Sequence, residues 1–172
     1  MMKKRLHELG QLIVACETYI VHGGKVLMHK RADDKEKFPG FWLGPGGHVD
    51  AGEDVFSTAL REVKEETGVE LQPNDVKLKV VAFHHHLDRQ EVWIEYLFRA
   101  EIPNQVEVRS TIEGKSEWIE VDRLLKMDNV FPPAKYYFDH ILNDKRGIMY
   151  AASTWRDSQL VEVQSQRVDS DF

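Results

Sequence analysis

The chain has 172 residues and a mass of 20.0 kDa, which suits one domain that buries a core without disulfides or a structural metal. Its formal net charge of −6 argues against a basic surface for long nucleic acids, and it admits a nucleotide only if a metal and local basic residues neutralise the phosphates. The single cysteine, Cys16, excludes an internal disulfide and a cysteine-cluster metal site.

No apolar stretch reaches the roughly 18 residues that a membrane span needs. The basic start, at 1–11, has no signal-peptide segment behind it, because Glu17 interrupts the apolar run that follows. With a single cysteine, these features predict a soluble, cytoplasmic protein. We expect one domain over residues 1–172, as a monomer or a homodimer that binds no membrane.

Two strands are predicted near the start, at 12–21 and 25–31, with a glycine-containing turn between them. A charged loop then leads to a short apolar strand at 41–46. Gly46 and Gly47 follow at its end and allow the backbone to approach a ligand closely.

The next segment predicts a helix from Asp54, a residue type that caps helix starts, to Gly68, which suits the left-handed residue after a helix. At about 100° per residue, Glu62, Glu65 and Glu66 share one face. Carboxylates at this spacing repel one another, and a hard divalent cation such as Mg²⁺ or Mn²⁺ would relieve the repulsion. A solvated acidic helix face is the alternative explanation.

Basic residues on the same helix are expected to point away from these acids. We predict that Arg61 reaches back to Glu53 and forms a bidentate pair that braces the preceding loop against the helix. An apolar stripe beside the acidic face would seat the helix on a core. Its residues are Phe56, Ala59, Leu60 and Val63.

Two further strands are predicted at 76–83 and 91–102, joined across the sequence HHHLDRQ. The three histidines at 84–86 suggest a metal site. However, successive strand residues point to opposite faces and cannot all converge on one ion, so contact with a substrate or a loop is the favoured interpretation.

The last third of the chain predicts a strand around Trp118, a short helix at 121–127 and a second helix from Phe131 to about Asn143 that opens on two prolines. Residues 147–163 predict a closing hairpin with its turn at 155–157. Strands mixed with two substantial helices indicate the α/β class, with a curved mixed sheet between helices.

Residues 47–69 resemble the Nudix box, G-x5-E-x7-R-E-U-x-E-E-x-G-U with U apolar, and they match it at every fixed position. A chance match has a frequency on the order of one in a billion windows. The matched residues are Gly47, Glu53, Arg61, Glu62, Val63, Glu65, Glu66, Gly68 and Val69.

This resemblance implies the Nudix fold, an α/β/α sandwich, and a hydrolase that uses Mg²⁺, with Mn²⁺ as a substitute, to cleave a nucleoside diphosphate linked to another group. It implies that Glu62, Glu65, Glu66 and the carbonyl of Gly46 hold the metal. Relatives take the proton from the attacking water with a box glutamate or a loop glutamate, so Glu65 is the first candidate for that role and Glu113 the second. Arg61 and Glu53 complete the catalytic set.

The resemblance also suggests which residues contact the substrate: Arg31, Leu43, Phe83, Phe131 and Lys135. Enzymes that sanitise oxidised purine nucleotides offer an asparagine and paired acids to the base. Since this chain has Leu43 and Lys135 at the positions that align, we expect those polar groups to be absent and base discrimination to be modest.

The first hypothesis is therefore a MutT-like enzyme that cleaves a nucleoside triphosphate to the monophosphate and pyrophosphate, with oxidised (8-oxo) purines among its substrates. Hydrolysis of ADP-ribose, a nucleotide sugar or a dinucleotide is the alternative. A third hypothesis, from another class, is a Nudix domain that senses a nucleotide without cleaving it. Such domains commonly lose box acids, and this box has lost none.

Overall fold

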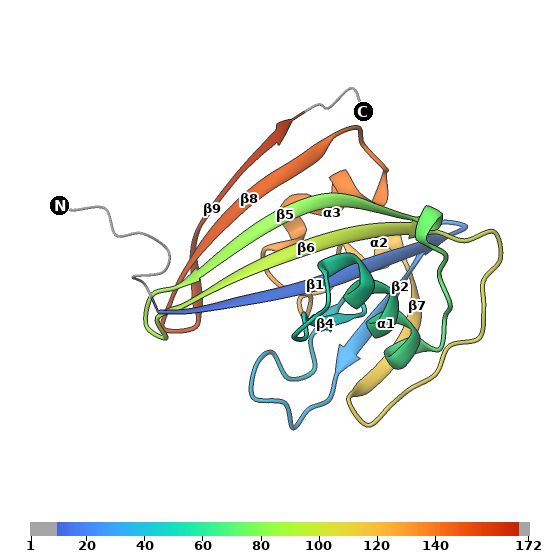
Figure 1. The fold of residues 1–172 in the computed structure, drawn as a ribbon, viewed down its shortest axis with the longest axis horizontal. Coiled ribbons are helices and arrows are strands. Elements are labelled where there is room, and N and C mark those ends of the chain that lie inside the picture. The colour runs from blue at the N-terminus through green and yellow to red at the C-terminus, as the bar shows by residue number, and fades with distance from the viewer. Residues whose placement is uncertain (1–9, 169–172) are drawn as a thin grey trace.

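The computed structural model describes residues 10–168, so the expected domain limits at residues 1 and 172 lie outside it. In that range a curved nine-stranded sheet lies between helix α1 (Val55–Thr67) on one face and helices α2 (Val121–Leu124) and α3 (Ala134–Leu142) on the other (Figure 1). The predicted α/β/α arrangement is confirmed. The strands are β1 (Gln11–His22), β2 (Lys25–Arg31), β3 (Trp42–Leu43), β4 (Gly46–His48), β5 (Val76–His86), β6 (Glu91–Glu101), β7 (Gly114–Glu120), β8 (Ile148–Arg156) and β9 (Gln159–Val168), and a 3-10 turn, η2, spans Pro73–Asp75.

The strand order is β3-β2-β1-β6-β5-β8-β9, and β4 and β7 pair with β1 and β2 off this path. Strand β1 runs parallel to β6, and β5 runs parallel to β8, whereas the other paired strands are antiparallel. The sheet is therefore mixed, as predicted.

The sheet divides between β1 and β2. These strands pair only near their hairpin turn, where Ile20 lies opposite Leu27 and His22 opposite Lys25. Further from the turn, residues 15–17 of β1 pair with β4, while β2 continues beside β3 and β7. This division places the glycines of β4 in the middle of the sheet, next to α1.

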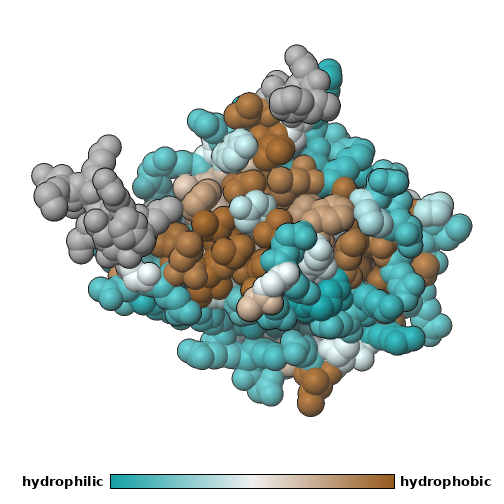
Figure 2. All heavy atoms as spheres, viewed as in Figure 1, coloured by the Kyte–Doolittle hydropathy of each residue, from teal (hydrophilic) through white to brown (hydrophobic). Residues whose placement is uncertain are grey.

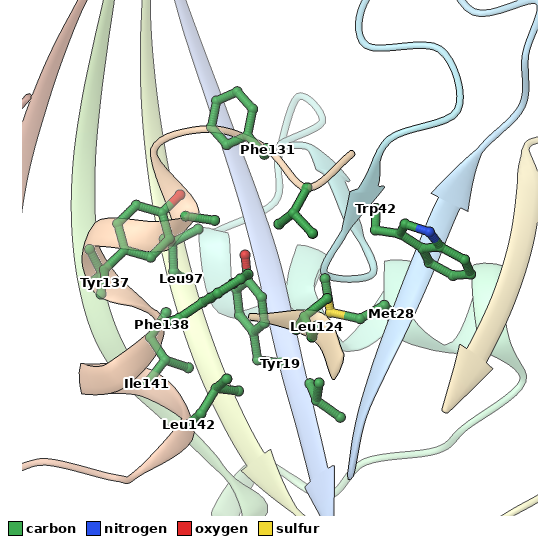
Figure 3. Close-up of a cluster of buried hydrophobic side chains, with 14 of the residues drawn as sticks. Tyr19, Met28, Trp42, Leu97, Leu124, Phe131, Tyr137, Phe138, Ile141 and Leu142 are labelled. Carbon is green, nitrogen blue, oxygen red and sulfur yellow. The ribbon is translucent and has the colours of Figure 1, made fainter. Parts of the chain in front are cut away.

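Side chains of β1 alternate between two cores, as the period of a strand requires. Cys16 and Ile20 pack under α1 with Ala59 and Val63. Tyr19, on the other face, packs against α3, and its ring meets that of Phe138 edge-on at 5.6 Å. Figure 3 shows this second core, in which Tyr19 lies among side chains from α2, α3 and the sheet.

The face of the sheet that carries α1 is only partly covered by that helix (Figure 1). Figure 2 shows hydrophobic residues gathered over the strands on this face, surrounded by hydrophilic ones. Within residues 10–168, no helix has both the length and the apolar character that crossing a membrane requires.

Three predicted elements need correction. The strand expected at 41–46 is two short strands, β3 and β4, because the chain turns at Gly44 and Pro45 to leave β2 and join β1. Strand β5 continues through the three histidines, which pair with both β6 and β8, so the turn lies at 87–90. The turn of the closing hairpin lies at 157–158, where φ is +50° and +60°, so Trp155 is a buried strand residue.

The remaining differences concern helix ends. Helix α2 ends at Leu124 and α3 spans Ala134–Leu142, so both are shorter than the predicted 121–127 and 131–143. The extra predicted residues include turns, at 125–126 after α2 and at 132–133 before α3.

Candidate active site

Helix α1 has the two ends that the sequence predicts. The Asp54 carboxylate accepts hydrogen bonds from the amides of Phe56 (2.8 Å) and Ser57 (3.0 Å), and Gly68 closes the helix with φ of +78°. Ala59 and Val63 are almost completely buried beneath the helix. Capping and burial together fix the rotation of α1, so its glutamates face strand β4 and the loops beside it.

These glutamates line a cavity of about 530 Å³, which we call the acid cavity. It brings together the four predicted metal ligands and Glu113, the loop glutamate that the resemblance suggests as a base. Its lining residues are Arg31, Lys35, Gly46, Gly47, His48, Asp50, Glu62, Glu65, Glu66, Thr111 and Glu113.

Glu66 is the most deeply placed of the box acids, with 9% of its surface exposed. One carboxylate oxygen accepts from the Gly46 amide at 2.9 Å, and the other lies 3.7 Å from Nε2 of His29. Burial raises the pKa of Glu66 to about 8, the charge of Glu62 adds to this, and the bond from Gly46 opposes it. Burial also raises the pKa of Glu62. Both environments disfavour the charged carboxylates, and a bound cation would reverse that preference.

Gly46 is a glycine because β4 lies against the backbone of β1. A Cβ atom at this position would lie 2.0 Å from the carbonyl oxygen of Cys16 and 2.8 Å from Cα of Glu17, and these backbone atoms cannot move aside. At Gly47 a Cβ atom would lie 2.5 Å from Oε1 of Glu62, so a side chain there would displace the Glu62 carboxylate from its place beside the loop.

The predicted bidentate pair between Arg61 and Glu53 is confirmed. Nε and one terminal nitrogen of Arg61 each donate to a different Glu53 oxygen at 2.9 Å, and the Thr58 hydroxyl donates to Glu53 at 2.8 Å. The bonds from Arg61 are the largest cause that lowers the pKa of Glu53 to about 2. The pair ties the loop before α1 to the helix.

The expectation that Arg61 points away from the glutamates of the helix was wrong for Glu62 and Glu65. Its Nη1 donates to Glu62 at 2.7 Å and to Glu65 at 3.2 Å. Because Glu65 is one turn further along the helix, a guanidinium held by Glu53 lies within reach of both. Among residues 10–168, no three His, Cys, Asp or Glu side chains already surround a common point as metal ligands would.

The donor set nevertheless fits a hard divalent cation. Glu62, Glu65, Glu66 and Glu113 offer only oxygen ligands, which Mg²⁺ and Mn²⁺ prefer, and they share one cavity with a glycine backbone. A cation held there would replace the bonds from Arg61 to Glu62 and Glu65, whereas the pair with Glu53 can remain.

Two basic side chains and Glu113 stand at the mouth of the acid cavity. Glu113 has an exposed carboxylate that lies 3.7 Å from Nζ of Lys35, and its carbonyl accepts from the Ala32 amide at 3.0 Å. Arg31 is held by a bond from Nε to the Lys37 carbonyl at 2.9 Å. The loops after β2 and before β7 are thereby joined, with positive charge between them.

A second cavity of about 480 Å³, which we call the inner cavity, lies next to the acid cavity. Apolar and aromatic side chains form much of its wall: Ile13, Ala15, Phe38, Leu43, Trp93 and Phe131. The two cavities share Arg31, Lys35, Gly46, Gly47, His48 and Glu66. A ligand can therefore extend from an aromatic chamber to the box acids.

The structure places three predicted substrate residues at these cavities and two away from them. Arg31, Leu43 and Phe131 line the inner cavity. Phe83 does not, because it lies beside His85 on the opposite face of β5, while His84 and His86 face the cavity. Lys135 is on the exposed side of α3 and lines neither cavity.

Sequence reasoning missed two buried acids, Glu17 and Glu95, in the wall of the inner cavity. Glu17 accepts from the Tyr19 hydroxyl at 2.7 Å and the Gly44 amide at 3.1 Å, and Glu95 lies 3.1 Å from Nε2 of His84. Burial raises the pKa of Glu17 to about 8, and the charge of Glu95 adds to this effect. The expectation that paired acids are absent was therefore wrong for the inner cavity, whose wall contains both. The signal was an acid within each of two largely apolar runs, at 12–21 and 92–98.

Known proteins share both the sequence pattern and the fold. The NUDIX domain model matches residues 14–140. The nucleoside triphosphatase NudI of Escherichia coli is 29% identical over 130 residues, which are 70% of this chain and 89% of that protein. The m7GpppN-mRNA hydrolase NUDT17 of Danio rerio is 42% identical over 52 residues, 30% of this chain but only 17% of that protein. The NUDT17 protein of Xenopus laevis is likewise matched over only 16% of its length.

Solved structures of other proteins share the fold of this chain. The MutT protein of Bacillus halodurans superposes with a TM-score of 0.76 at 25% identity, covering 89% of this chain and 97% of that one. The NUDIX domain of Shewanella oneidensis NrtR, solved with ADP ribose, has a TM-score of 0.61 at 20% identity, covers 79% of this chain and 88% of its own, and shows the fold alone. The family model, the intact motif on α1 and the shared fold lead to one conclusion: the chain belongs to the NUDIX domain family of hydrolases.

Proposed function

We propose that this chain hydrolyses nucleoside triphosphates to the monophosphate and pyrophosphate with Mg²⁺, for which Mn²⁺ can substitute. The observation that carries the proposal is the junction of the two cavities, which share Arg31, Gly46 and Glu66. A base and sugar in the inner cavity would place their phosphates against the box acids. Oxidised purine nucleotides belong among the substrates to be tested.

The carboxylates of Glu62, Glu65 and Glu66 and the carbonyl of Gly46 would hold the cation. When bound, such a cation neutralises phosphate charge that builds in the transition state and lowers the pKa of water. Arg31 and Lys35, where the cavities join, supply positive charge for phosphate oxygens.

The water that attacks phosphorus must give up a proton to a base in the acid cavity. Glu65 and Glu113 are the candidates, because their carboxylates are 60% and 63% exposed and both line this cavity. Glu66 is less suited, since it is buried and already accepts a bond from Gly46. We place Glu65 first and Glu113 second.

The similarity to NudI, a nucleoside triphosphatase by name, supports this choice of substrate. ADP-ribose hydrolysis is the second candidate, because one structural neighbour is a NUDIX domain in complex with ADP ribose and another is described as a bifunctional NMN adenylyltransferase and ADP ribose pyrophosphatase. Those likenesses extend to the fold only.

A substrate panel with Mg²⁺ separates the candidates. It would contain the common nucleoside triphosphates, 8-oxo-dGTP, ADP-ribose, a nucleotide sugar and a dinucleoside polyphosphate, and it would score pyrophosphate, orthophosphate and nucleotide products. The proposal predicts pyrophosphate and a monophosphate from at least one triphosphate. Cleavage of ADP-ribose alone would favour the second candidate, and nucleotide binding without any cleavage would favour a sensing domain.

A further inference from the structure

Two polar side chains that take no part in the proposed reaction are buried beneath α1. His29 on β2 and Ser116 on β7 lie opposite each other in the antiparallel pair of these strands, so their side chains share one face of the sheet. Leu27, two residues before His29, packs under α1, and the alternation of a strand places His29 on the same side. Only 4% of His29 and 5% of Ser116 is exposed. Polar groups buried this deeply cost free energy unless they are hydrogen-bonded, and these two bond to each other.

Ser116 completes the end of α1. Carbonyl groups in the last turn of a helix have no amide partner further along the helix. Glu66 is the last residue but one of α1, and its carbonyl accepts from the Ser116 hydroxyl at 3.1 Å. Because that hydroxyl has a single proton, Oγ of Ser116 must accept from Nδ1 of His29, which lies 3.0 Å away. A chain of hydrogen bonds therefore runs from His29 through Ser116 to the backbone of Glu66.

The same imidazole ring also meets the side chain of Glu66. Nε2 of His29 lies 3.7 Å from Oε1 of Glu66, which is longer than a hydrogen bond. The Gly46 amide holds the other carboxylate oxygen, Oε2, at 2.9 Å. Within residues 10–168, Oε1 accepts no hydrogen bond. Glu66 is thus held at its backbone and at Oε2, while Oε1 keeps its lone pairs for a cation.

The His29 ring has no room to swing away from Glu66. A Cβ atom at Gly114, the first residue of β7, would lie 2.4 Å from Nε2 of His29 and 2.1 Å from the carbonyl oxygen of Lys30. One edge of the ring is therefore packed against the backbone of Gly114, and the other edge is bonded to Ser116. Strand β7 fixes the ring from both sides.

We propose that His29 and Ser116 are positioning residues that hold the Glu66 carboxylate in place for a divalent cation. The inference deepens the proposed function, because it assumes that the acid cavity binds this cation. Neither residue lines that cavity, so both act through Glu66. Groups that orient a metal ligand commonly contribute about 10- to 100-fold to metal affinity. A pair that only filled the space between β2 and β7 would affect stability and leave metal affinity alone.

Mn²⁺ binding without nucleotide, followed by electron paramagnetic resonance, tests the pair. We expect Ser116→Ala and His29→Leu each to lower the Mn²⁺ affinity about tenfold. Ser116→Thr, which keeps the hydroxyl, should stay within about threefold of the wild type. The double variant should lose little more than either single variant, because both residues act through one chain of bonds. Ser165→Ala, on the exposed strand β9, is the control and should leave the affinity unaltered.

Kinetics separates positioning of the metal ligand from a general loss of structure. In Ser116→Ala the Mg²⁺ concentration for half-maximal activity should rise about tenfold, whereas kcat at saturating Mg²⁺ should stay within about threefold of the wild type. A variant with damaged structure would instead lose kcat at every Mg²⁺ concentration.

Folded Ser116→Ala and His29→Leu variants that bind Mn²⁺ as tightly as the wild type would overturn the proposal. A measurement on the wild type needs no variant: Mg²⁺ titration of protein with ¹⁵N-labelled histidine. The Nε2 resonance of His29 should shift as Mg²⁺ binds, whereas that of His22, which lines neither the acid cavity nor the inner cavity, should not. An unchanged His29 resonance at saturating Mg²⁺ would also overturn the proposal.

The two proposals can fail separately. Weaker Mn²⁺ binding in the variants of a protein that cleaves no triphosphate would support the positioning pair and contradict the proposed function. Cleavage of triphosphates together with unaltered Mn²⁺ affinity in the variants would support the function and contradict the pair. A wild-type protein that binds no Mn²⁺ would contradict both.

Discussion

The two cavities are both lined by glutamates, but the charge of these acids is balanced in different ways. The guanidinium of Arg61 donates to Glu62 and Glu65 of the acid cavity, and it also donates to Glu53 in the loop before α1. In the inner cavity Glu17 and Glu95 receive only a hydroxyl, an amide and an imidazole. A metal ion could therefore take the place of Arg61 at Glu62 and Glu65. Within residues 10–168, no lysine or arginine forms an ion pair with Glu17 or Glu95, and burial raises the pKa of Glu17 instead.

Replacing a buried or half-buried glutamate of the acid cavity should have the largest effect on kcat/KM. We predict that Glu62→Gln or Glu66→Gln lowers kcat/KM on the order of 10³-fold, because each removes a charged oxygen that stabilises the transition state through the cation. Pyrophosphate release measures this, with thermal unfolding to show that the variants fold. Glu70→Gln, an exposed glutamate just beyond α1, is the matched control and should retain activity. Full activity in both cavity variants would remove the catalytic account.

Replacing the residue that accepts the proton from the attacking water should lower kcat by a smaller factor. The comparison distinguishes two exposed acids of the acid cavity. Glu65→Gln is expected to lower kcat by about 10²-fold, the scale of general base catalysis, and Glu113→Gln by about tenfold. Steady-state kinetics across a pH series provides the comparison. A larger loss in Glu113→Gln would reverse the assignment and make the loop glutamate the base.

The stability of the protein should depend on pH because Glu17 is buried in the inner cavity. The pKa of folded Glu17, about 8, lies above its ordinary 4.5, so between these values the folded chain binds more protons than the unfolded chain and stability falls as pH rises. Glu17→Gln removes this penalty. We predict a melting temperature about 2–4 °C above the wild type at pH 9 and near it at pH 5, measured by calorimetry. An equal difference at both pH values would show that Glu17 is not held in this environment.

The smallest effect is expected outside both cavities. Lys135 was a sequence-based candidate for substrate contact, yet it is exposed on α3 and lines neither cavity. Lys135→Ala should therefore change kcat/KM by less than about twofold, as surface substitutions away from a site do. A strong rise in KM would mean that the substrate extends over α3.

The difference between the cavities also explains what the sequence could predict. The acid cavity depends on one contiguous motif, so helix caps, spacing and the Arg61–Glu53 pair followed from the sequence and agree with the structure. The contacts from Arg61 to Glu62 and Glu65 could not be predicted from the sequence, because they depend on where the loop holds the guanidinium.

The inner cavity is assembled from distant strands. Glu17 and Glu95 meet only because β1 and β6 are parallel neighbours, a pairing that no local pattern specifies. Phe83 was misplaced for a related reason: which face of β5 meets the cavity depends on the register with β6 and β8, and that register turns His84 inward and Phe83 outward.

The central claim is that the acids of α1 can share a divalent cation once Arg61 releases two of them. Titration with Mn²⁺, followed by electron paramagnetic resonance in the presence of a non-hydrolysable triphosphate analogue, tests it most directly. We predict a site that Mg²⁺ competes for and whose Mn²⁺ affinity falls by about tenfold or more in Glu62→Gln and Glu66→Gln. Equal Mn²⁺ affinity in the wild type and both variants would contradict the claim.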